Sequence, residues 1–526
     1  EHEEIWPMIV ASRRNYLFVG ESIDPNDWQA NVTADQIYQR VIDGVHHEDG
    51  HIILLHDAGG SSRKPTLDAL PRIIETLQHE GYQFISLEQY LGMNKQTLMP
   101  EINKGKAYYA MQTNLWLAEM IYHVSDFLTA LFLVFLALGM MRLIFMYVLM
   151  IREKRAENRG NYAPIDAATA PTVSIIVPGY NEEVNIVRTI TTLKQQDYPN
   201  LHIYFVDDGS KDHTLERVHE AFDNDDTVTV LAKKNGGKAS ALNYGIAACR
   251  SEYVVCIDAD TQLKNDAVSR LMKHFIADTE KRVGAVAGNV KVGNQRNMLT
   301  YWQAIEYTSS QNFDRMAYSN INAITVVPGA IGAFRKEVIE AVGGFTTDTL
   351  AEDCDLTMSI NEHGYIIENE NYAVAMTEAP ETLRQFVKQR IRWCFGVMQA
   401  FWKHRSSLFA PSKKGFGLWA MPNMLIFQYI IPTFSPLADV LMLIGLFTGN
   451  ALQIFFYYLI FLVIDASVSI MAYIFEGERL WVLLWVIPQR FFYRWIMYYV
   501  LFKSYLKAIK GELQTWGVLK RTGHVQ

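Results

Sequence analysis

The chain has 526 residues, too many for a single hydrophobic core, and this length predicts about three or four structural units. The net charge of −8, and the lack of a lysine- and arginine-rich stripe with interleaved aromatic residues, argue against a nucleic-acid-binding protein. Hydrophobic residues make up 50% of the chain, but they crowd into about 115–151 and 416–505, whereas 171–400 has the composition of a soluble domain.

The four cysteines include no C-x-x-C pair and are expected to be reduced thiols in the cytoplasm. Because the chain begins at Glu1, we expect a fragment of a longer protein.

Residues 1–100 contain an Asp24-x-x-Asp27-Trp motif and a Leu-His56-Asp motif, with strands expected over 51–57 and 82–87 and a helix over 66–80. This region resembles the C-terminal portion of NodB-like polysaccharide deacetylases, and the resemblance matches His56 to their catalytic histidine. The family's upstream T-F-D-D-G and H-x-x-x-H motifs are missing. His47 and His51 have the latter spacing but precede the L-H-D motif, so we interpret them as part of a solvated turn. We therefore expect an extracytoplasmic region without deacetylase activity.

Residues 124–151 form an apolar run long enough to cross a bilayer. A buried helix of a soluble protein is the alternative. The basic residues that follow favour the membrane interpretation, because such clusters flank spans on the cytoplasmic side; they are Arg152, Lys154, Arg155 and Arg159. This orientation places the region that precedes the span outside and the central domain inside.

From residue 171 onward, apolar strands alternate with helices. Strands are expected over 173–178, 202–206, 227–231 and from Tyr253 to the aspartates at 258, with helices over 183–196 and 238–250. This alternation predicts a parallel, doubly wound α/β sheet, whose ligands bind beyond the carboxyl ends of the strands. Polar clusters follow three of these strands: 179–182, 207–210 and 258–260.

The central motif is Asp258-Ala-Asp260, directly after a strand. The i, i+2 spacing points both carboxylates to one side of an extended backbone, and their repulsion is relieved by a hard cation with oxygen ligands. We therefore expect a Mg²⁺ or Mn²⁺ site beside a diphosphate. The alternative is a pair of solvated loop carboxylates.

These residues resemble family 2 glycosyltransferases of the GT-A (Rossmann-like) fold, in particular the membrane-embedded processive synthases that make cellulose, hyaluronan, chitin oligomers and poly-N-acetylglucosamine. The resemblance covers about 170–400 closely, and we place the transferase domain at 171–405. It implies a nucleotide site that includes Lys238 of Asn-Gly-Gly-Lys, and it makes Asp260 the metal ligand. The other residues implied at the nucleotide are Tyr180, Glu182, Asp207, Asp208 and Asp258.

Two further motifs complete the expected site. Leu-Ala-Glu-Asp353 matches the element that supplies the general base in this family, and a sugar hydroxyl needs such a base to become a nucleophile. Gly329 lies in a small-residue segment that the resemblance places near the acceptor sugar; a tight turn is the alternative. In Gln389-Arg-Ile-Arg392-Trp393, helical spacing puts the glutamine, the second arginine and the tryptophan on one face. The resemblance implies Arg392 on the diphosphate, and Gln389 and Trp393 at the acceptor.

Membrane or interfacial helices are expected over 416–505: 418–446, interrupted by prolines, 451–475 and 480–501. Four crossings would put the C-terminus outside, whereas the basic tail at 506–526 prefers the cytoplasm. Arg490 and Arg494 would allow an interfacial last segment.

The sequence favours an inverting, metal-dependent synthase that extends a β-linked polysaccharide from a UDP-sugar, with the growing polymer as acceptor, and passes it through the bilayer of the plasma membrane. UDP-N-acetylglucosamine is the favoured donor, because a deacetylase-like region fits a polymer with N-acetyl groups. Three alternatives remain: a single transfer to a polyprenyl-phosphate acceptor, a deacetylase with a membrane anchor, and a non-catalytic polysaccharide-binding or transport subunit.

Overall fold

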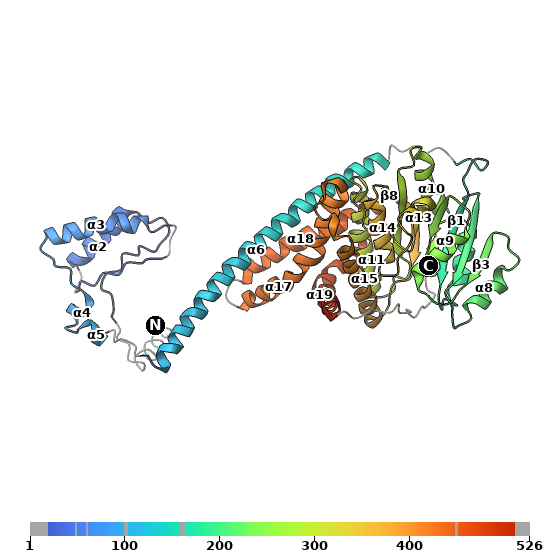
Figure 1. Ribbon diagram of the computed structural model, residues 1–526. Coiled ribbons are helices and arrows are strands. Elements are labelled where there is room, and N and C mark those ends of the chain that lie inside the picture. The colour runs from blue at the N-terminus through green and yellow to red at the C-terminus, as the bar shows by residue number, and fades with distance from the viewer. Residues whose placement is uncertain are drawn as a thin grey trace. The chain divides into compact units, whose positions relative to one another are not determined.

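A computed structural model describes residues 19–47, 50–58, 62–98, 104–157, 165–447 and 451–510. The chain divides into two compact units, Glu1–Ser125 and Asp126–Gln526 (Figure 1). The expected basic tail at 506–526 lies outside the described residues beyond Lys510.

The first unit packs two amphipathic helices, α2 (Ala34–His47) and α3 (Lys64–His79), through apolar residues such as Ile37, Val41 and Ile73. Two short helices follow, α4 (Leu87–Tyr90) and α5 (Lys95–Leu98). The helix expected over 66–80 is therefore present. The strands expected over 51–57 and 82–87 are wrong: the described part of this unit has a single β-bridge, between Ile23 and Ile53, and 83–86 is irregular. An apolar run alone does not make a strand where no partner strand lies beside it.

Helix α6 (Lys106–Glu157) contains Asp126–Arg155, which among the described residues is the single helix long and apolar enough to cross a membrane. The second part of α6 runs alongside α17 (Ile431–Phe447) and α18 (Ala451–Glu476) (Figure 1). The rings of Phe135 and Phe434 lie 6.2 Å apart, and the hydroxyls of Tyr147 and Ser467 are 3.3 Å apart. The span predicted at 124–151 thus coincides with one continuous apolar helix.

The second unit is built on an eight-stranded sheet in the order β3-β2-β1-β4-β7-β6-β8-β5. Its strands are β1 (Val173–Gly179), β2 (Leu201–Asp207), β3 (Val228–Ala232), β4 (Tyr253–Cys256), β5 (Gln262–Leu263), β6 (Val283–Val292), β7 (Gly332–Arg335) and β8 (Ile366–Thr377). The first four strands in this order are mutually parallel, as predicted, and β6 is parallel to β8. Strand β7 runs antiparallel to both β4 and β6. The carboxyl ends of β1, β4, β6 and β8 and the beginning of β7 therefore meet at one edge of the sheet.

Alternating side chains of β1 enter two separate cores, one on each face of the sheet. Ile176 packs on α9 (Lys238–Ala248), whereas Ile175 and Val177 pack on α7 (Ile186–Lys194). Helix α9 approaches the sheet closely at Gly245, where a Cβ atom would lie 2.7 Å from a methyl group of Ile176. The expected helices over 183–196 and 238–250 are thus present; α7 is shorter by three residues at its start and two at its end, and α9 by two at its end.

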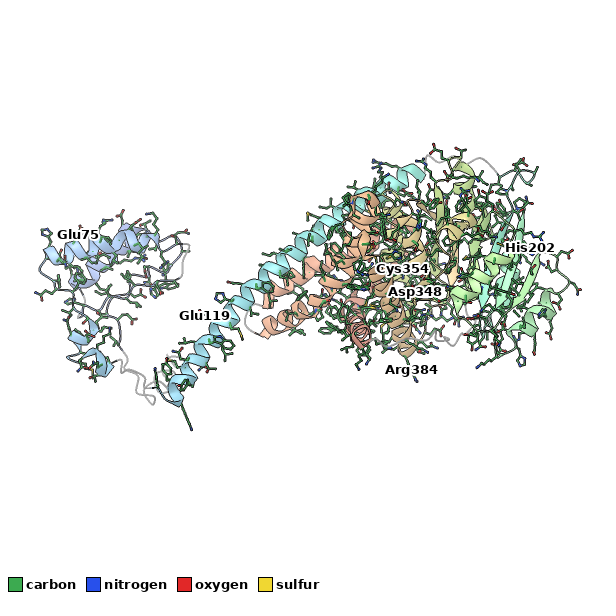
Figure 2. The ribbon with its side chains drawn as sticks, viewed as in Figure 1. Glu75, Glu119, His202, Asp348, Cys354 and Arg384 are labelled. Atoms are coloured by element: carbon green, nitrogen blue, oxygen red, sulfur yellow. The ribbon has the colours of Figure 1, made fainter. Side chains whose placement is uncertain are left out.

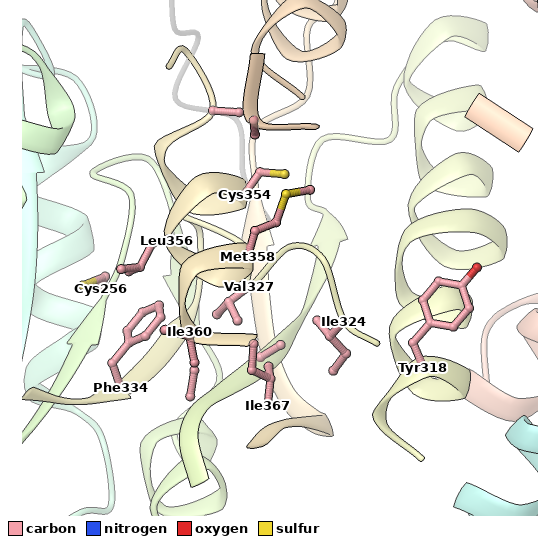
Figure 3. Packing of buried hydrophobic residues seen from close by; sticks show 14 of the residues in the cluster. Cys256, Tyr318, Ile324, Val327, Phe334, Cys354, Leu356, Met358, Ile360 and Ile367 are labelled. Carbon is pink, nitrogen blue, oxygen red and sulfur yellow. The ribbon is translucent and has the colours of Figure 1, made fainter. Parts of the chain in front are cut away.

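The remaining helices of this unit cover the sheet and its carboxyl edge. They are α8 (Thr214–Phe222), α10 (Ala267–Ala277), α11 (Met298–Glu306), the π-helix η1 (Tyr307–Asn312), α12 (Phe313–Ser319), α13 (Lys336–Ala341), α14 (Glu352–Glu362) and α15 (Leu383–Lys403). Figure 3 shows Leu356, Met358 and Ile360 of α14 among buried residues that include Val327 and Phe334. This packing fixes the N-terminal turn of α14, which carries Glu352 and Asp353.

The described residues of the C-terminal region are mostly helical. It comprises η2 (Arg405–Ser407), η3 (Pro411–Lys413), η4 (Phe416–Ala420), α16 (Met421–Asn423), η5 (Met424–Ile430), α17, α18, η6 (Leu480–Trp485) and α19 (Val486–Lys510). The prolines were expected to interrupt the segment 418–446. Helix α17 instead continues through Pro432 and Pro436 to Phe447. The π-helical turn η5 directly precedes Pro432, at the point where that proline removes a backbone N–H.

Candidate active site

A cavity of about 410 Å³ lies at the carboxyl edge of the sheet, a size typical of ligand pockets, which range over roughly 300–1,000 Å³. Its walls come from the segments after β1 and β4, the ends of β6 and β8, the loop before β7, the N-terminal turns of α9 and α14, and the helices η1, α12, α15 and η5. Segments far apart in the sequence form the walls of one cavity, because parallel strands bring their carboxyl ends together at one edge of the sheet.

Most of the residues predicted for the site line this one cavity. Ten of them do so: Tyr180, Glu182, Lys238, Asp258, Asp260, Gly329, Asp353, Gln389, Arg392 and Trp393. Asp260, Asp353 and Trp393 all line this cavity. Had they lain on different surfaces, the predicted site would have been contradicted. Asp207 and Asp208 are buried beside the cavity and do not line it.

Asp208 holds the Asn-Gly-Gly-Lys loop in place. Its carboxylate accepts hydrogen bonds from the backbone N–H groups of Gly236 (3.0 Å) and Gly237 (2.7 Å) and pairs with Lys233 at 2.7 Å. Gly237 has a φ of +84°, which glycine adopts readily, and α9 begins at the next residue, Lys238. This aspartate thus sets the position of Lys238.

Asp207 closes the turn after β2. Its Oδ2 atom accepts hydrogen bonds from the N–H groups of Gly209 and Ser210, both at 3.1 Å. The other oxygen, Oδ1, is buried and has no partner among the described residues. A buried carboxylate oxygen of this kind is costly unless a donor reaches it.

Lys238 is surrounded by carboxylates. Its ammonium lies 2.5 Å from Asp258 Oδ1 and 3.1 Å from Glu352 Oε1. Burial alone would lower its pKa, but the charges of Asp258, Glu352 and Asp353 raise the pKa above its usual value, so the side chain is a cation. Gly329 is adjacent, because a Cβ atom there would lie 2.5 Å from Lys238 Nζ. Any side chain at residue 329 would therefore displace the lysine.

Asp353 is held by backbone donors. Its oxygens accept hydrogen bonds from the N–H groups of Gly329 (3.2 Å) and Cys354 (2.8 Å). Burial and the adjacent charge of Glu352 raise the pKa of Asp353 to about 6. The next residue, Cys354, which is labelled in Figure 2, is fully buried. A positioned carboxylate whose pKa lies near neutrality suits a general base.

The helical face predicted for Gln389, Arg392 and Trp393 is confirmed, since all three line the cavity from α15. The intervening Arg390 is buried behind them, 2.7 Å from Glu306 and with its guanidinium 4.3 Å from the centre of the Trp393 ring. This cation–π contact supports the tryptophan from within the helix bundle.

Several cavity residues were not predicted from the sequence. They are Tyr307, Ser310, Gln311, Asp314, Arg315, Tyr318, Glu378 and Gln428. Most lie on η1 and α12, and Tyr307 places its ring 6.3 Å from that of Trp393. No short motif marks this segment. The sequence signal that this segment offers is its many polar residues, in a stretch that proves to be largely buried in the structure.

The charges of the cavity walls are mainly negative. Seven carboxylate side chains and three cationic ones line it: Glu182, Asp258, Asp260, Asp314, Glu352, Asp353 and Glu378 against Lys238, Arg315 and Arg392. A nucleoside diphosphate would be repelled by such a surface unless a divalent cation accompanied it. Asp258 and Asp260 are therefore suited to a hard cation that takes its other ligands from phosphate and water.

A separate cluster lies in the first unit. Ligand atoms of Asp24, Asp27 and His56 lie within 4.8 Å of one another. Asp27 is fully buried and accepts hydrogen bonds from His56 Nδ1 (2.8 Å) and Thr66 Oγ1 (2.9 Å). His47 and His51 are exposed, as predicted, but His47 is the last residue of α2 and does not lie in a turn. The carboxylate of Asp27 thus orients the ring of His56.

Comparison with known proteins identifies the class of the central domain. Residues 174–343 match the family model described as Glycosyl transferase family 2, so the segment from β1 to just beyond α13 is a glycosyltransferase domain of family 2. The match ends before Asp353 and Arg392.

Individual relatives are more specific. The chain is 32% identical over 260 residues to the poly-beta-1,6-N-acetyl-D-glucosamine synthase of Staphylococcus epidermidis, covering 49% of this chain and 62% of that protein. It is 33% identical over 224 residues to the synthase of the same name from Staphylococcus aureus strain COL, covering 43% and 54%. The chain thus spans little more than half the length of these relatives. A solved structure, the mannosyltransferase PcManGT from Pyrobaculum calidifontis in complex with GDP-Man and Mn²⁺, aligns with a TM-score of 0.48 at 24% identity, over 66% of this chain and 95% of that one.

Proposed function

We propose that the protein is an inverting, metal-dependent glycosyltransferase that polymerises a β-linked polysaccharide from UDP-N-acetylglucosamine. The observation that carries this proposal is the convergence of Asp260, Asp353 and Trp393 on one cavity. These residues would supply the metal ligand, the base and the acceptor platform.

In the proposed reaction, Asp353 accepts the proton of the acceptor hydroxyl as its oxygen attacks C1 of the donor sugar. The new C1–O bond forms as the bond from C1 to the UDP oxygen breaks on the opposite face, so an α-linked donor gives a β-linked product. Lys238 and Arg392 hold the diphosphate charge, and the flat ring of Trp393 stacks on the C–H face of the acceptor.

Asp260 and Asp258 would hold Mg²⁺ or Mn²⁺. Such a cation, when bound, stabilises the negative charge of the departing UDP. Asp260 is buried, whereas Asp258 is partly exposed. The deeper burial of Asp260 supports it as the principal ligand. The nucleoside would lie near Tyr180, Glu182 and the unpartnered oxygen of Asp207.

The choice of donor and polymer is supported by the relatives, which are named as poly-beta-1,6-N-acetyl-D-glucosamine synthases. Transfer of the polymer into the bilayer is supported by the cavity wall, which includes Gln428 and Tyr318. The adjacent Asp314 pairs at 2.9 Å with Arg142, inside the apolar span of α6. We propose a multi-pass plasma-membrane protein with its transferase domain in the cytoplasm. We also propose that the first unit is the C-terminal part of a deacetylase-like domain.

Polymer synthesis is the direct test. Membranes that contain the protein, supplied with Mn²⁺ and UDP-N-acetylglucosamine, are expected to make an N-acetylglucosamine polymer of high molecular mass, and UDP-glucose or UDP-glucuronate is expected to give little. Size-exclusion chromatography of radiolabelled product measures this, with membranes containing Asp353→Asn as the control. A labelled product of a single sugar, extractable into organic solvent, would instead indicate transfer to polyprenyl phosphate.

The pH dependence of synthesis should follow Asp353. A general base acts only when unprotonated, and because the pKa of Asp353 is raised to about 6, kcat is expected to rise about tenfold per pH unit below 6 and to level off above 7. Initial rates at saturating donor and metal between pH 5 and 8 measure this profile. A flat profile over that range would assign the base to another group.

A further inference from the structure

Three arginines are almost fully buried among the described residues, and one of them lacks a counterion. Arg335 pairs with Glu252 at 3.1 Å, and Arg390 pairs with Glu306 at 2.7 Å. Arg315, 6% exposed, forms no ion pair with any described carboxylate, and its Nε atom is buried without a hydrogen-bond partner. Removing a cation from water without a counterion is costly, so such a residue calls for an explanation.

Each carboxylate whose charge acts on Arg315 has another partner. Asp314 pairs with Arg142 at 2.9 Å, Glu476 with Lys291 at 3.2 Å, and Asp353 accepts two backbone N–H groups. The described partner of the guanidinium is the neutral side-chain oxygen of Asn312, one turn earlier. Burial lowers the pKa of Arg315 to about 10, so the side chain is still a cation at neutral pH.

Arg315 lines the cavity from α12, next to residues that suit a neutral sugar. Gln311 and Tyr318 lie on the same wall and offer amide and phenol groups. The charge of Arg315 also acts on Asp353, the carboxylate that an attacking hydroxyl would have to contact. The cations assigned to the diphosphate come from other elements, Lys238 from α9 and Arg392 from α15.

We infer that Arg315 is an acceptor-binding residue, which donates hydrogen bonds from its guanidinium to an oxygen of the terminal sugars of the growing polysaccharide. The inference rests on the proposed function and adds a contact on the acceptor side. A guanidinium donates only, so its partner is a hydroxyl or acetamide oxygen. Part of the cost of burying the cation in the empty enzyme is offset when the acceptor binds.

The test compares two arginine-to-methionine variants. Arg315→Met is expected to weaken binding of a β-linked N-acetylglucosamine tetrasaccharide, and to raise its KM as acceptor, by about 10- to 100-fold, the effect of one charge-assisted hydrogen bond. The affinity for UDP with Mn²⁺ should not change. The melting temperature should stay equal or rise, because a cation without a counterion has been removed. The matched control, Arg390→Met, should melt at a lower temperature, because it leaves the Glu306 carboxylate without its counterion.

A glucosamine tetrasaccharide distinguishes the two sources of the oxygen. If the acetamide is the partner, Arg315→Met loses affinity for the acetylated oligomer only; if a hydroxyl is the partner, it loses affinity for both. Wild-type affinity for both oligomers in Arg315→Met, or a melting temperature lowered as in Arg390→Met, would overturn the inference. Failure of the proposed function would instead appear as absent UDP-sugar turnover in the wild type, whereas tetrasaccharide binding is measured by calorimetry without turnover.

Discussion

Replacement of Asp353 by asparagine is expected to lower kcat about 10²- to 10⁴-fold, the usual contribution of a general base, while UDP binding changes less than about twofold. The amide cannot accept the proton of the attacking hydroxyl. It retains the shape of the carboxylate, and the contacts of Lys238 with Asp258 and Glu352 do not involve it. Single-turnover polymerisation, with UDP affinity measured by calorimetry in Mn²⁺, separates the two effects.

Two neighbouring carboxylates on α14 serve as controls. Asp355 does not line the cavity: it contacts Thr346, Lys403 and His404, so it joins the beginning of α14 to the end of α15. Asp355→Asn should therefore lower the melting temperature without removing the base-dependent limb of the pH profile. Glu352 pairs with Lys238 at 3.1 Å. If Glu352→Gln abolished kcat and Asp353→Asn did not, the base would be Glu352.

The parts of the site that the sequence predicts are those that local pattern determines. The apolar runs of β1 and β4 are buried on both faces and that of β2 is buried toward its carboxyl end, which makes them unambiguous as central strands, and the aspartates at 258 and 260 follow the last of them. Helical spacing places Gln389, Arg392 and Trp393 on one face whatever the surroundings. The geometry that joins these motifs follows from the parallel order of the strands.

Other features depend on tertiary contacts that no local pattern reveals. Asp207 and Asp208 follow a strand as Asp258 does, but they do not line the cavity. The carboxylate of Asp208 instead accepts hydrogen bonds from the backbone N–H groups of Gly236 and Gly237 in the Asn-Gly-Gly-Lys loop. The reversed strand β7 is four residues long, too short for a periodic signal. Arg315 is indistinguishable by sequence from an ion-paired arginine, since the difference lies in which carboxylates reach it.

Replacement of Asp260 by asparagine is expected to remove the dependence of donor binding on the divalent cation. Because seven carboxylates line the cavity, the diphosphate needs a cation, and Asp260 is the buried member of the Asp258–Asp260 pair. Loss of one charged ligand should weaken Mn²⁺ affinity by at least about 10- to 100-fold, the loss seen even for outer-shell partners, with a fall in polymerisation of similar or larger size. Calorimetric titration of UDP with and without Mn²⁺ measures this.

The chelated wild-type protein is the control for this variant. In EDTA, Asp260→Asn should bind UDP no more weakly than the wild type, because the affinity that the substitution removes depends on the metal. Asp258→Asn, by contrast, frees Lys238 from its 2.5 Å contact and should alter UDP affinity in EDTA as well. The decisive quantity is the Mn²⁺ concentration that gives half of the maximal increase in UDP affinity. If this concentration were unchanged in Asp260→Asn and shifted in Asp258→Asn, the metal ligand would be Asp258, and Asp260 would be a structural residue of the loop.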